Sequence, residues 1–346
     1  MNKKIYINAR FLTQPITGVQ RFAIELSKEL KQSNHSIVFL SPRDIIHKEL
    51  SSELEVKTIG FLKGHLWEQL ELQPFVFFNK GLLISFCNTA PLFLKDQIVT
   101  VHDLCFRIYP QWFSKPFSLF YNFMIPKICN NSKAIITVSE TSKNELHHEL
   151  GIPLHKVSVI YNGVADIFKK NIDVSMDPLV VGDYILTVSS HHPRKNFTRL
   201  VEAFKLLNNK NLKLCIVGNM HKNFKDTRKE INDNILYLNN ISDAELLNYY
   251  KHAKLFVFPS VYEGFGIPII EAMQFDVPVC VSDIPVFNEI CIDNAIYFNP
   301  LLVEDISSKI KKCLSNPIKS SVDFTKFNWR NGAQKIIELI NINYVK

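Results

Sequence analysis

Strand-like and helix-like segments alternate along almost the whole chain, and this alternation constrains the fold more than any other feature. It predicts parallel sheets covered by helices, because a helix returns the chain to begin each new parallel strand. In the first half, the expected strands are 4–8, 36–40, 82–86, 98–101, 134–138 and 157–160, and the expected helices are 19–31, 66–77, 116–129 and 140–149. In the second half, the expected strands are 184–188, 213–217, 235–238, 254–258 and 279–281, and the expected helices are 196–207, 243–252, 303–314 and 329–342. We therefore expect an α/β protein made of two halves of similar size.

The length of 346 residues suits two domains of about 150 residues each. An irregular stretch at 162–183, which contains proline and glycine, separates the two alternating series. We expect an N-terminal Rossmann-like domain at 1–165, a linker at 166–182 and a C-terminal Rossmann-like domain at 183–328. The last helix, about 329–346, is expected to pack back on the first domain. Two such domains should face each other across a cleft between the carboxyl ends of their sheets.

Composition narrows the class of protein. The apolar share of 47% and the charged share of 21% are typical of a globular protein with a large core. The seven cysteines form no C-x-x-C pair, which favours reduced thiols over disulfides or a zinc site, and Cys215 and Cys280 fall in strand patterns. Neither a secretory signal nor an apolar run of about 18 residues is visible, so we expect a cytoplasmic protein.

The net charge of +7 is unevenly distributed. Residues 1–165 hold 18 basic and 13 acidic residues, a difference of +5, and the remainder holds 22 and 20, a difference of +2. A basic half suits contact with an anionic membrane or a phosphorylated substrate, although a solvated basic surface explains it equally well. The chain has no basic run and no zinc-finger or RNA-binding motif, so nucleic acid is not an expected partner.

Two carboxylates, Glu263 and Glu271, stand eight positions apart where a strand pattern gives way to a helix pattern. Gly264 and Gly266 lie between them and allow a ligand to approach the backbone closely. Pro268 suits the first turn of a helix, whose N-terminus offers unpaired N–H groups to an anionic or hydroxyl-rich ligand. An ordinary capped helix explains the same residues equally well.

Three further motifs follow expected strands or open expected helices. Arg194 and Lys195 open an expected helix, where the positive end of the helix dipole disfavours basic residues. Their charge is explained if they bind a diphosphate. Two exposed basic residues are the simpler explanation. His102 follows a strand and precedes Asp103, a position suited to polar or catalytic work or to a structural cap. Gly18 lies where a loop becomes a helix and either meets a phosphate or only caps the helix. No Asp-x-Asp occurs, which favours metal-free catalysis.

Together these motifs resemble the family 4 glycosyltransferases, which have the GT-B fold and retain the anomeric configuration. The resemblance spans nearly the whole chain and rests on Thr17–Arg21, Thr100–Leu104, Ile136–Glu140, Val159–Val164, Pro193–Asn196, Ile241–Leu246 and Glu263–Glu271, in the family's order. Asn8-Ala9-Arg10 and Trp67-Glu68-Gln69 are most similar to bacterial mannosyltransferase-like members, which build O-antigens, capsules or exopolysaccharides.

The resemblance implies a role for each matching residue. Gly18 would approach the donor diphosphate, although the Thr17-Gly18 loop lacks the consecutive glycines of some relatives. His102 would lie beside the reacting anomeric centre, and Arg194 and Lys195 would neutralise the departing phosphates. The remaining donor-site residues would be Glu263 on the sugar, Glu271 on the ribose, Phe265, Gly266 and Ile267 through backbone N–H groups, and Ser189, Ile241 and Gly264 around them.

The implied activity is metal-independent hexosyl transfer, with mannose as the first candidate, from GDP-mannose or a UDP- or dTDP-sugar, and without a cofactor. The implied acceptor is a lipid-diphosphate-linked saccharide at the inner face of the cytoplasmic membrane. The aromatic and basic segment 112–121 suits a membrane interface, and a buried core helix is the alternative. A nucleotide-sugar epimerase and a noncatalytic scaffold remain alternative functions.

Overall fold

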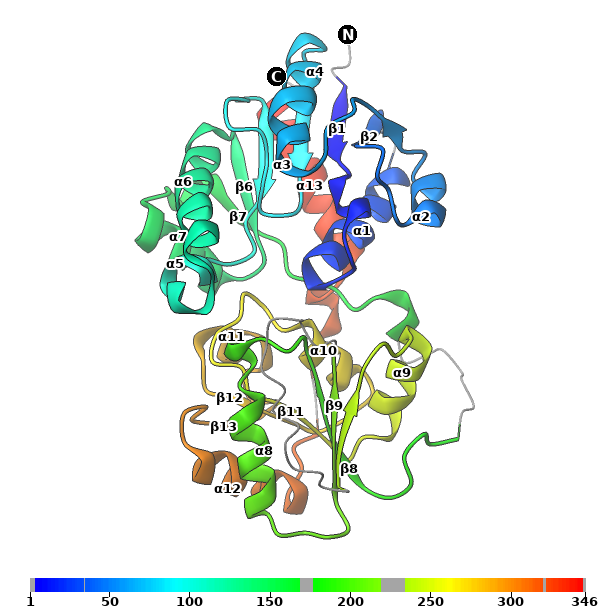
Figure 1. Cartoon of the computed structure of the whole chain (residues 1–346), viewed down its shortest axis with the longest axis vertical. Helices are drawn as coiled ribbons and strands as arrows, with labels where there is room; N and C mark the ends of the chain where they lie inside the picture. Colours follow the sequence, from blue (N-terminus) through cyan, green and yellow to red (C-terminus); the bar gives the residue numbers. More distant parts are fainter. Residues whose placement is uncertain (1–3, 34, 169–176, 219–233, 320–321, 345–346) are drawn as a thin grey trace. The chain divides into compact units, whose positions relative to one another are not determined.

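The computed structural model describes residues 4–33, 35–168, 177–218, 234–319 and 322–344. Contacts divide the chain into two compact units (Figure 1). Unit 1 comprises Met1–Gly163 and Thr325–Lys346, and unit 2 comprises Val164–Phe324. The predicted linker 166–182 therefore falls in unit 2, and its residues 169–176 lie outside the described part of the chain.

Unit 1 contains a seven-stranded parallel sheet in the order β3-β2-β1-β4-β5-β6-β7. Its strands are β1 (Ile5–Asn8), β2 (Ile37–Ser41), β3 (Lys57–Thr58), β4 (Leu82–Ser85), β5 (Gln97–Thr100), β6 (Ala134–Thr137) and β7 (Val157–Val159). Its helices are α1 (Gly18–Lys31), α2 (Lys48–Glu53), α3 (Gly64–Trp67), α4 (Gln73–Phe78), α5 (Cys105–Ile108), α6 (Lys115–Asn131), α7 (Glu140–Leu150) and α13 (Trp329–Tyr344). A π-helical turn, η2 (Glu68–Leu72), joins α3 to α4.

Helices cover both faces of this sheet, with α3 and α4 on one face and α13 on the other (Figure 1). Trp67 and Val76 pack on Tyr6 and Leu83 of the central strands. On the opposite side α13 packs against α1, although the two helices stand at the two ends of the sequence. This burial of apolar side chains from both layers is the main force that holds the unit together.

Unit 2 contains a six-stranded parallel sheet in the order β10-β9-β8-β11-β12-β13. Its strands are β8 (Tyr184–Val188), β9 (Lys213–Val217), β10 (Ile235–Leu238), β11 (Leu255–Phe258), β12 (Val279–Ser282) and β13 (Ile296–Phe298). Its helices are α8 (Phe197–Leu206), α9 (Asp243–His252), α10 (Ile267–Gln274), α11 (Pro285–Cys291) and α12 (Val303–Ser315). Helices α8 and α12 pack on one face of the sheet through apolar side chains such as Leu200, Phe204, Ile306 and Ile310.

The strand order reverses once in each sheet. In unit 1 the reversal lies between β1 and β4, and in unit 2 it lies between β8 and β11. At such a point the loops that follow the two strands run in opposite directions. A crevice therefore forms at the carboxyl ends of the two strands, where α/β proteins bind ligands. Both sheets thus have one position that the topology favours for a site.

The prediction of an α/β protein with two parallel-sheet halves is confirmed. The expected helix 66–77 is wrong in part, because its centre is the wider turn η2. Pro74 has no N–H to donate to a carbonyl one turn earlier, which disfavours a regular α-helix there. Sequence patterns also missed α2, β3, α5, α11 and β13, which are all short.

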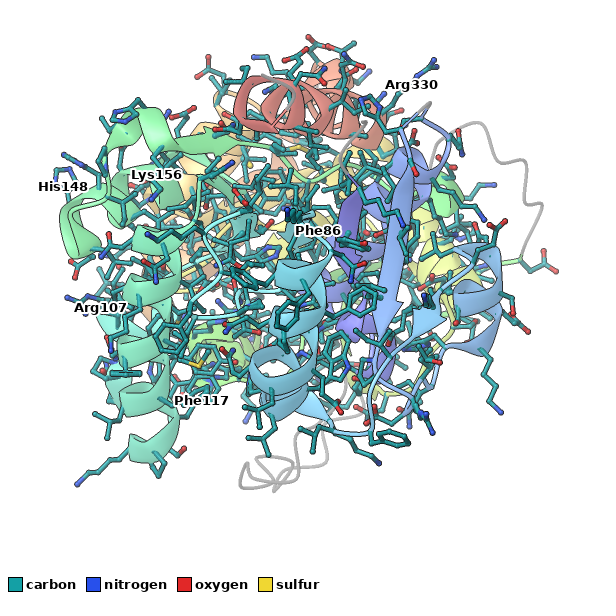
Figure 2. The ribbon with its side chains drawn as sticks, turned by 90° about the horizontal axis from the view of Figure 1, so that it is seen from above. Phe86, Arg107, Phe117, His148, Lys156 and Arg330 are labelled. Carbon is teal, nitrogen blue, oxygen red and sulfur yellow. The ribbon has the colours of Figure 1, made fainter. Side chains whose placement is uncertain are left out.

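The aromatic segment 112–121 is largely exposed, so the expectation of a buried core helix is wrong for it. Phe117 and Leu119 on α6 are exposed, whereas Met124 and Ile128 on the later part of the helix are buried. Phe117 lies near one end of α6 at the margin of the unit, and Phe86 lies in the interior (Figure 2). Helix α6 thus has an apolar inner face in its second half and an apolar outer face in its first half.

All seven cysteines lie in the described part of the chain, where none forms a disulfide and six are buried. Cys215 and Cys280 are core residues of β9 and β12, as predicted. Among the described helices, none combines the length and the apolar character needed to cross a membrane.

Candidate functional site

The two loops that follow β8 and β11 meet through a buried ion pair. Lys195, which follows β8, donates from Nζ to Oε1 of Glu263, which follows β11. Ser260 Oγ donates to the same oxygen at 2.7 Å, and Arg194 Nη1 lies 3.6 Å from Oε2. The cluster therefore lies where the strand order of unit 2 reverses.

The charges of this cluster support one another. Burial would raise the pKa of the Glu263 carboxyl, but the charges of Lys195 and Arg194 and the hydrogen bonds from Lys195 and Ser260 outweigh it and hold the pKa below its ordinary value. Glu263 is therefore ionised at neutral pH. Two cations, Arg194 and Lys195, lie beside one carboxylate in this cluster, an arrangement that suits an anionic ligand.

Arg194 and Lys195 lie in a separate 3-10 turn, η6 (Pro193–Lys195), rather than in the first turn of α8. Asn196 follows in the left-handed conformation, at φ 58°, and begins α8 in a new direction. The expected position of the two basic residues in the first turn of a helix is therefore wrong, and so is the alternative of two exposed residues, because Lys195 is buried. The backbone N–H of Val261 donates to the carbonyl of Arg194 at 2.8 Å and holds the two loops together.

The second predicted carboxylate, Glu271, is the fifth residue of α10 and is buried. Tyr250 on α9 donates its hydroxyl to Glu271 Oε2 at 2.9 Å, which fixes the orientation of the carboxylate. Gly266 precedes α10 with φ 126°, a conformation that side chains rarely adopt. The loop residues Gly264 and Phe265 are buried beside it. The first N–H groups of α10 thus begin at the same loop that carries Glu263.

The ends of β8 and β9 approach each other closely. Ser189 donates its backbone N–H to Val217 O at 2.9 Å. A Cβ on Gly218 would lie only 1.7 Å from Ser189 O, so no larger residue fits without a shift. Ile241 is half-buried in the loop just before α9. Ser189 therefore lies on the same sheet edge as Lys195 and Glu263.

Two predicted residues, His102 and Gly18, belong to unit 1. Gly18 is the exposed first residue of α1, behind a capping box formed by Thr17 and Gln20. The capping box explains why Gly18 stands at the start of a helix, and it gives no indication of a contact with a phosphate.

His102 is buried just beyond the end of β5. Its Nε2 lies 2.8 Å from the carbonyl oxygen of Phe86, and its ring is nearly perpendicular to that of Phe22, with the ring centroids 4.9 Å apart. A carbonyl oxygen only accepts, so Nε2 carries the hydrogen and Nδ1 is left as the acceptor. Burial lowers the pKa of His102, against the smaller opposing effects of the Phe86 hydrogen bond and of Asp103. The imidazole is therefore neutral at pH 7.

Sequence reasoning missed Ser260, Tyr250 and Gly218. A glycine directly after a strand is a usable signal for close backbone approach, which applies to Gly218. Ser260 and Tyr250 gave no local signal, because each is defined by a hydrogen bond to a carboxylate on another part of the fold. In the described residues, no group of three or more His, Cys, Asp or Glu side chains is arranged to hold a metal ion.

Comparison with known proteins gives two family matches. The family described as "Glycosyl transferases group 1" matches residues 181–328, and the family described as "Glycosyltransferase Family 4" matches residues 82–166. The two matches fall in different halves of the chain and together cover most of its length.

Individual relatives extend the comparison. The O-antigen chain mannosyltransferase RfbU of Salmonella typhimurium is 33% identical over 230 residues, which span 65% of this chain and 62% of RfbU. The O-antigen chain mannosyltransferase B of Escherichia coli is 22% identical and is matched over 95% of this chain and 97% of its own length. Among solved structures, Anabaena HepE in complex with UDP and glucose has a TM-score of 0.74 at 16% identity, over 99% of this chain and 100% of HepE. The last similarity is one of fold.

Proposed function

As this chain belongs to glycosyltransferase family 4, with the GT-B fold, we propose that it transfers a hexose from a nucleotide-sugar to a saccharide acceptor with retention of configuration. The observation that carries the proposal is the Lys195–Glu263 pair with Arg194, which stands at the strand-order reversal of unit 2. Mannose is the first candidate because RfbU and mannosyltransferase B are named as mannosyltransferases. GDP-mannose is the donor to test first, followed by UDP- and dTDP-sugars.

In this proposal unit 2 holds the donor. Arg194 and Lys195 stabilise the charge that develops on the diphosphate as the glycosidic bond breaks. Glu263 accepts hydrogen bonds from the transferred sugar, and Glu271 accepts them from the ribose. Backbone N–H groups of Phe265, Gly266 and Ile267 support sugar and phosphate, and Ser189, Gly264 and Ile241 complete the pocket.

The chemistry needs no enzyme nucleophile. The acceptor oxygen attacks the anomeric carbon on the face that the phosphate leaves, through an oxocarbenium-like state. The leaving phosphate takes the acceptor proton, so charge and proton balance without an acid–base pair. His102 is assigned a place beside the anomeric centre, where its neutral imidazole serves as a polar group rather than a cation. We assign diphosphate contact to Gly18 on family resemblance alone.

We further propose a lipid-diphosphate-linked acceptor at the inner face of the cytoplasmic membrane, in the synthesis of an O-antigen or a related polysaccharide. The exposed Phe117, Leu119 and Phe123 of α6, together with Lys115 and Lys127, support this because apolar and basic side chains suit an anionic membrane surface. Flotation with vesicles containing anionic lipid is the test. Loss of flotation in a Leu119→Asp/Phe123→Asp variant is expected, and a wild-type protein that stays in the aqueous fraction argues against membrane contact.

The donor is tested by thermal stabilisation with GDP-, UDP- and dTDP-sugars, because a ligand that binds only the native state raises the melting temperature. The stabilising donor is then incubated with and without saccharide acceptors, and the product anomer is determined by NMR. Acceptor-dependent formation of the retained anomer is expected. Isomerised sugar without an acceptor would identify an epimerase, and a protein that no nucleotide stabilises would be a noncatalytic relative.

A further inference from the structure

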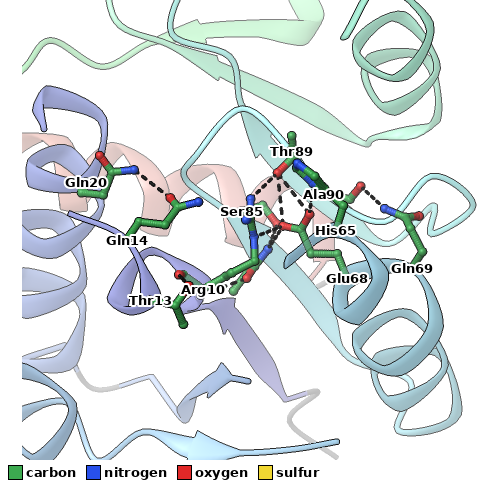
Figure 3. A network of polar contacts seen from close by, with 11 residues as sticks. Arg10, Thr13, Gln14, Gln20, His65, Glu68, Gln69, Ser85, Thr89 and Ala90 are labelled. Carbon is green, nitrogen blue, oxygen red and sulfur yellow. Dashed lines mark hydrogen bonds and ion pairs between the residues drawn. The ribbon is translucent and has the colours of Figure 1, made fainter. Parts of the chain in front are cut away.

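The π-helical turn η2 presents two consecutive polar side chains, Glu68 and Gln69, to one loop, residues 86–92, which follows β4 (Figure 3). Neighbouring residues on a regular α-helix point in clearly different directions. The wider π turn reduces that difference, and such turns often occur at functional sites. Helices α3 and α4 therefore meet the loop through a local irregularity.

Glu68 is the centre of the first contact. Its carboxylate accepts from Arg10 Nε at 3.0 Å, from Asn8 Nδ2 at 2.9 Å and from His65 Nδ1 at 3.0 Å. Thr89 of the loop donates its hydroxyl to the same carboxylate at 3.1 Å and accepts from Arg10 Nη2 at 2.9 Å. Thr89 is thus held between both members of a buried ion pair.

Burial would raise the pKa of the Glu68 carboxyl, but the charge of Arg10, together with His65 and Asn8, outweighs it and keeps the pKa below the ordinary value. The carboxylate is ionised and nearly inaccessible to water, with 1% of its side chain exposed. Hydrogen bonds to a buried charge are among the stronger ones in proteins. The loop is therefore fastened firmly at Thr89.

Gln69 makes the second contact. Its Nε2 donates to Ala90 O at 3.1 Å, and its Oε1 accepts from the backbone N–H of Leu92 at 2.9 Å. One side of the loop is thus fixed at three of its residues by two adjacent side chains.

The other side of the same loop holds His102. Phe86 O accepts from His102 Nε2, and Asn88 Oδ1 accepts from the His102 backbone N–H, both at 2.8 Å. Asn88 has φ 60°, and its N–H donates to Thr100 O at 3.0 Å, so this part of the loop is closely defined as well. The atoms that determine which imidazole nitrogen carries the hydrogen therefore belong to a loop that Glu68 and Arg10 fasten.

We infer that Glu68, together with Arg10 and Thr89, is a positioning residue that fixes the place and tautomer of His102 through residues 86–90. The inference gives a role to the Asn8-Ala9-Arg10 and Trp67-Glu68-Gln69 motifs. It rests on the proposed function, because His102 matters to transfer only if it lies beside the reacting centre.

The test uses the full-length protein with Thr89→Val, which removes the hydroxyl at nearly constant volume, and Thr89→Ser, which retains it. Long-range proton–nitrogen NMR of histidine-labelled protein reports the tautomer and the pKa of His102, with the His102→Gln spectrum identifying its signals. In the wild type we expect hydrogen on Nε2 and a pKa below 6.5. In Thr89→Val we expect the pKa to rise toward 6.5 and both tautomers to appear, because the loosened loop admits water.

Steady-state kinetics provides a second measurement. Thr89→Val and Glu68→Gln are expected to lower kcat by about 10- to 100-fold while the donor KM changes little, and Thr89→Ser is expected to restore most of the loss. Ser132→Ala removes another buried hydroxyl of unit 1 and should affect neither the NMR signals nor kcat.

The outcomes separate the two proposals. An unaltered His102 titration in folded Thr89→Val and Glu68→Gln overturns the inference, whatever the activity. A wild-type protein without transfer activity overturns the proposed function, and the NMR measurement still determines whether Glu68 and Thr89 position His102.

Discussion

Lys195 and Glu263 are 68 residues apart in sequence and are both almost completely buried. Taking two charges out of water carries a desolvation penalty that offsets much of their attraction, so such a pair is weak evidence for stability. Its position at the sheet edge and the second cation, Arg194, support the proposed role in binding. The same residues thus satisfy one another's charges and hydrogen bonds and are also suited to contact an anion.

Replacing both Arg194 and Lys195 with Ala is expected to lower kcat by about 100- to 1000-fold or more, because the leaving diphosphate then lacks compensating charge. The measurement is initial rate at saturating donor. Lys311→Ala/Lys312→Ala on the exposed face of α12 removes the same charge elsewhere and should leave kcat unchanged. Near-normal turnover of the Arg194/Lys195 variant would contradict the diphosphate assignment.

Tyr250→Phe is expected to raise the donor KM several-fold with little change in kcat, because Glu271, the proposed ribose ligand, loses the hydrogen bond that orients its carboxylate. A typical hydrogen bond to a charged group contributes about 1.5 to 3 kcal/mol, which sets the upper end of the effect. The control is Tyr249→Phe, which removes a hydroxyl from the same helix. If Tyr250→Phe and Tyr249→Phe have the same donor KM, Tyr250 does not act through Glu271.

Helices and strands that have a signal in their own sequence could be predicted, whereas those that depend on contacts with distant residues could not. Helix α9 was predicted to the residue, because Ser242 and Glu245 form a capping box within one turn of its start. Strand β13 was missed and has only three residues, although β7 is equally short and was predicted. The turn η2 depends on Pro74 and on packing together, and a sequence pattern shows only the first.

The candidate site followed the same rule. Glu263 and Glu271 could be proposed from the sequence because a strand, a glycine-rich loop and a helix start follow one another there. Their partners Ser260 and Tyr250 were missed, and the ion pair with Lys195 was not foreseen, because these contacts exist only after the strands are ordered in the sheet.

The junction of β8 and β9 offers a prediction at this scale. Gly218→Ala is expected to destabilise the protein by more than Gly182→Ala does, because both glycines have positive φ but only Gly218 would place a Cβ against a backbone oxygen. An unusual φ alone is worth about 1 to 3 kcal/mol. Urea denaturation of both variants measures the difference. Equal destabilisation would mean that the two strand ends separate easily.

At the level of the whole molecule, the C-terminal helix belongs to unit 1, although it follows unit 2 in the sequence. The chain passes from unit 1 to unit 2 after Gly163 and returns after Phe324. Helix α13 then packs on α1, and Lys335 Nζ donates to Val159 O of unit 1 at 3.3 Å. The stability of the first unit therefore depends on the last residues of the chain.

Ile336→Ala is expected to destabilise unit 1 by about 2 to 5 kcal/mol, because Ile336 is fully buried there. Hydrogen exchange with peptide-level detection should show the loss of protection in unit 1, including strands more than 170 residues away in sequence. Ile310→Ala, an equally buried residue of α12, should reduce protection in unit 2 instead. Loss confined to peptides near residue 336 would show that α13 does not stabilise the unit.

Under the proposed function, the ion pair at the edge of the unit 2 sheet also limits which molecules can compete for the site. A ligand that separates Lys195 from Glu263 must bring negative charge for the first and hydroxyl donors for the second. A free hexose offers hydroxyls but no negative charge, so it matches Glu263 and leaves Lys195 without a counter-ion. A molecule that carries both groups replaces the whole arrangement, so we expect free hexoses to compete poorly with it.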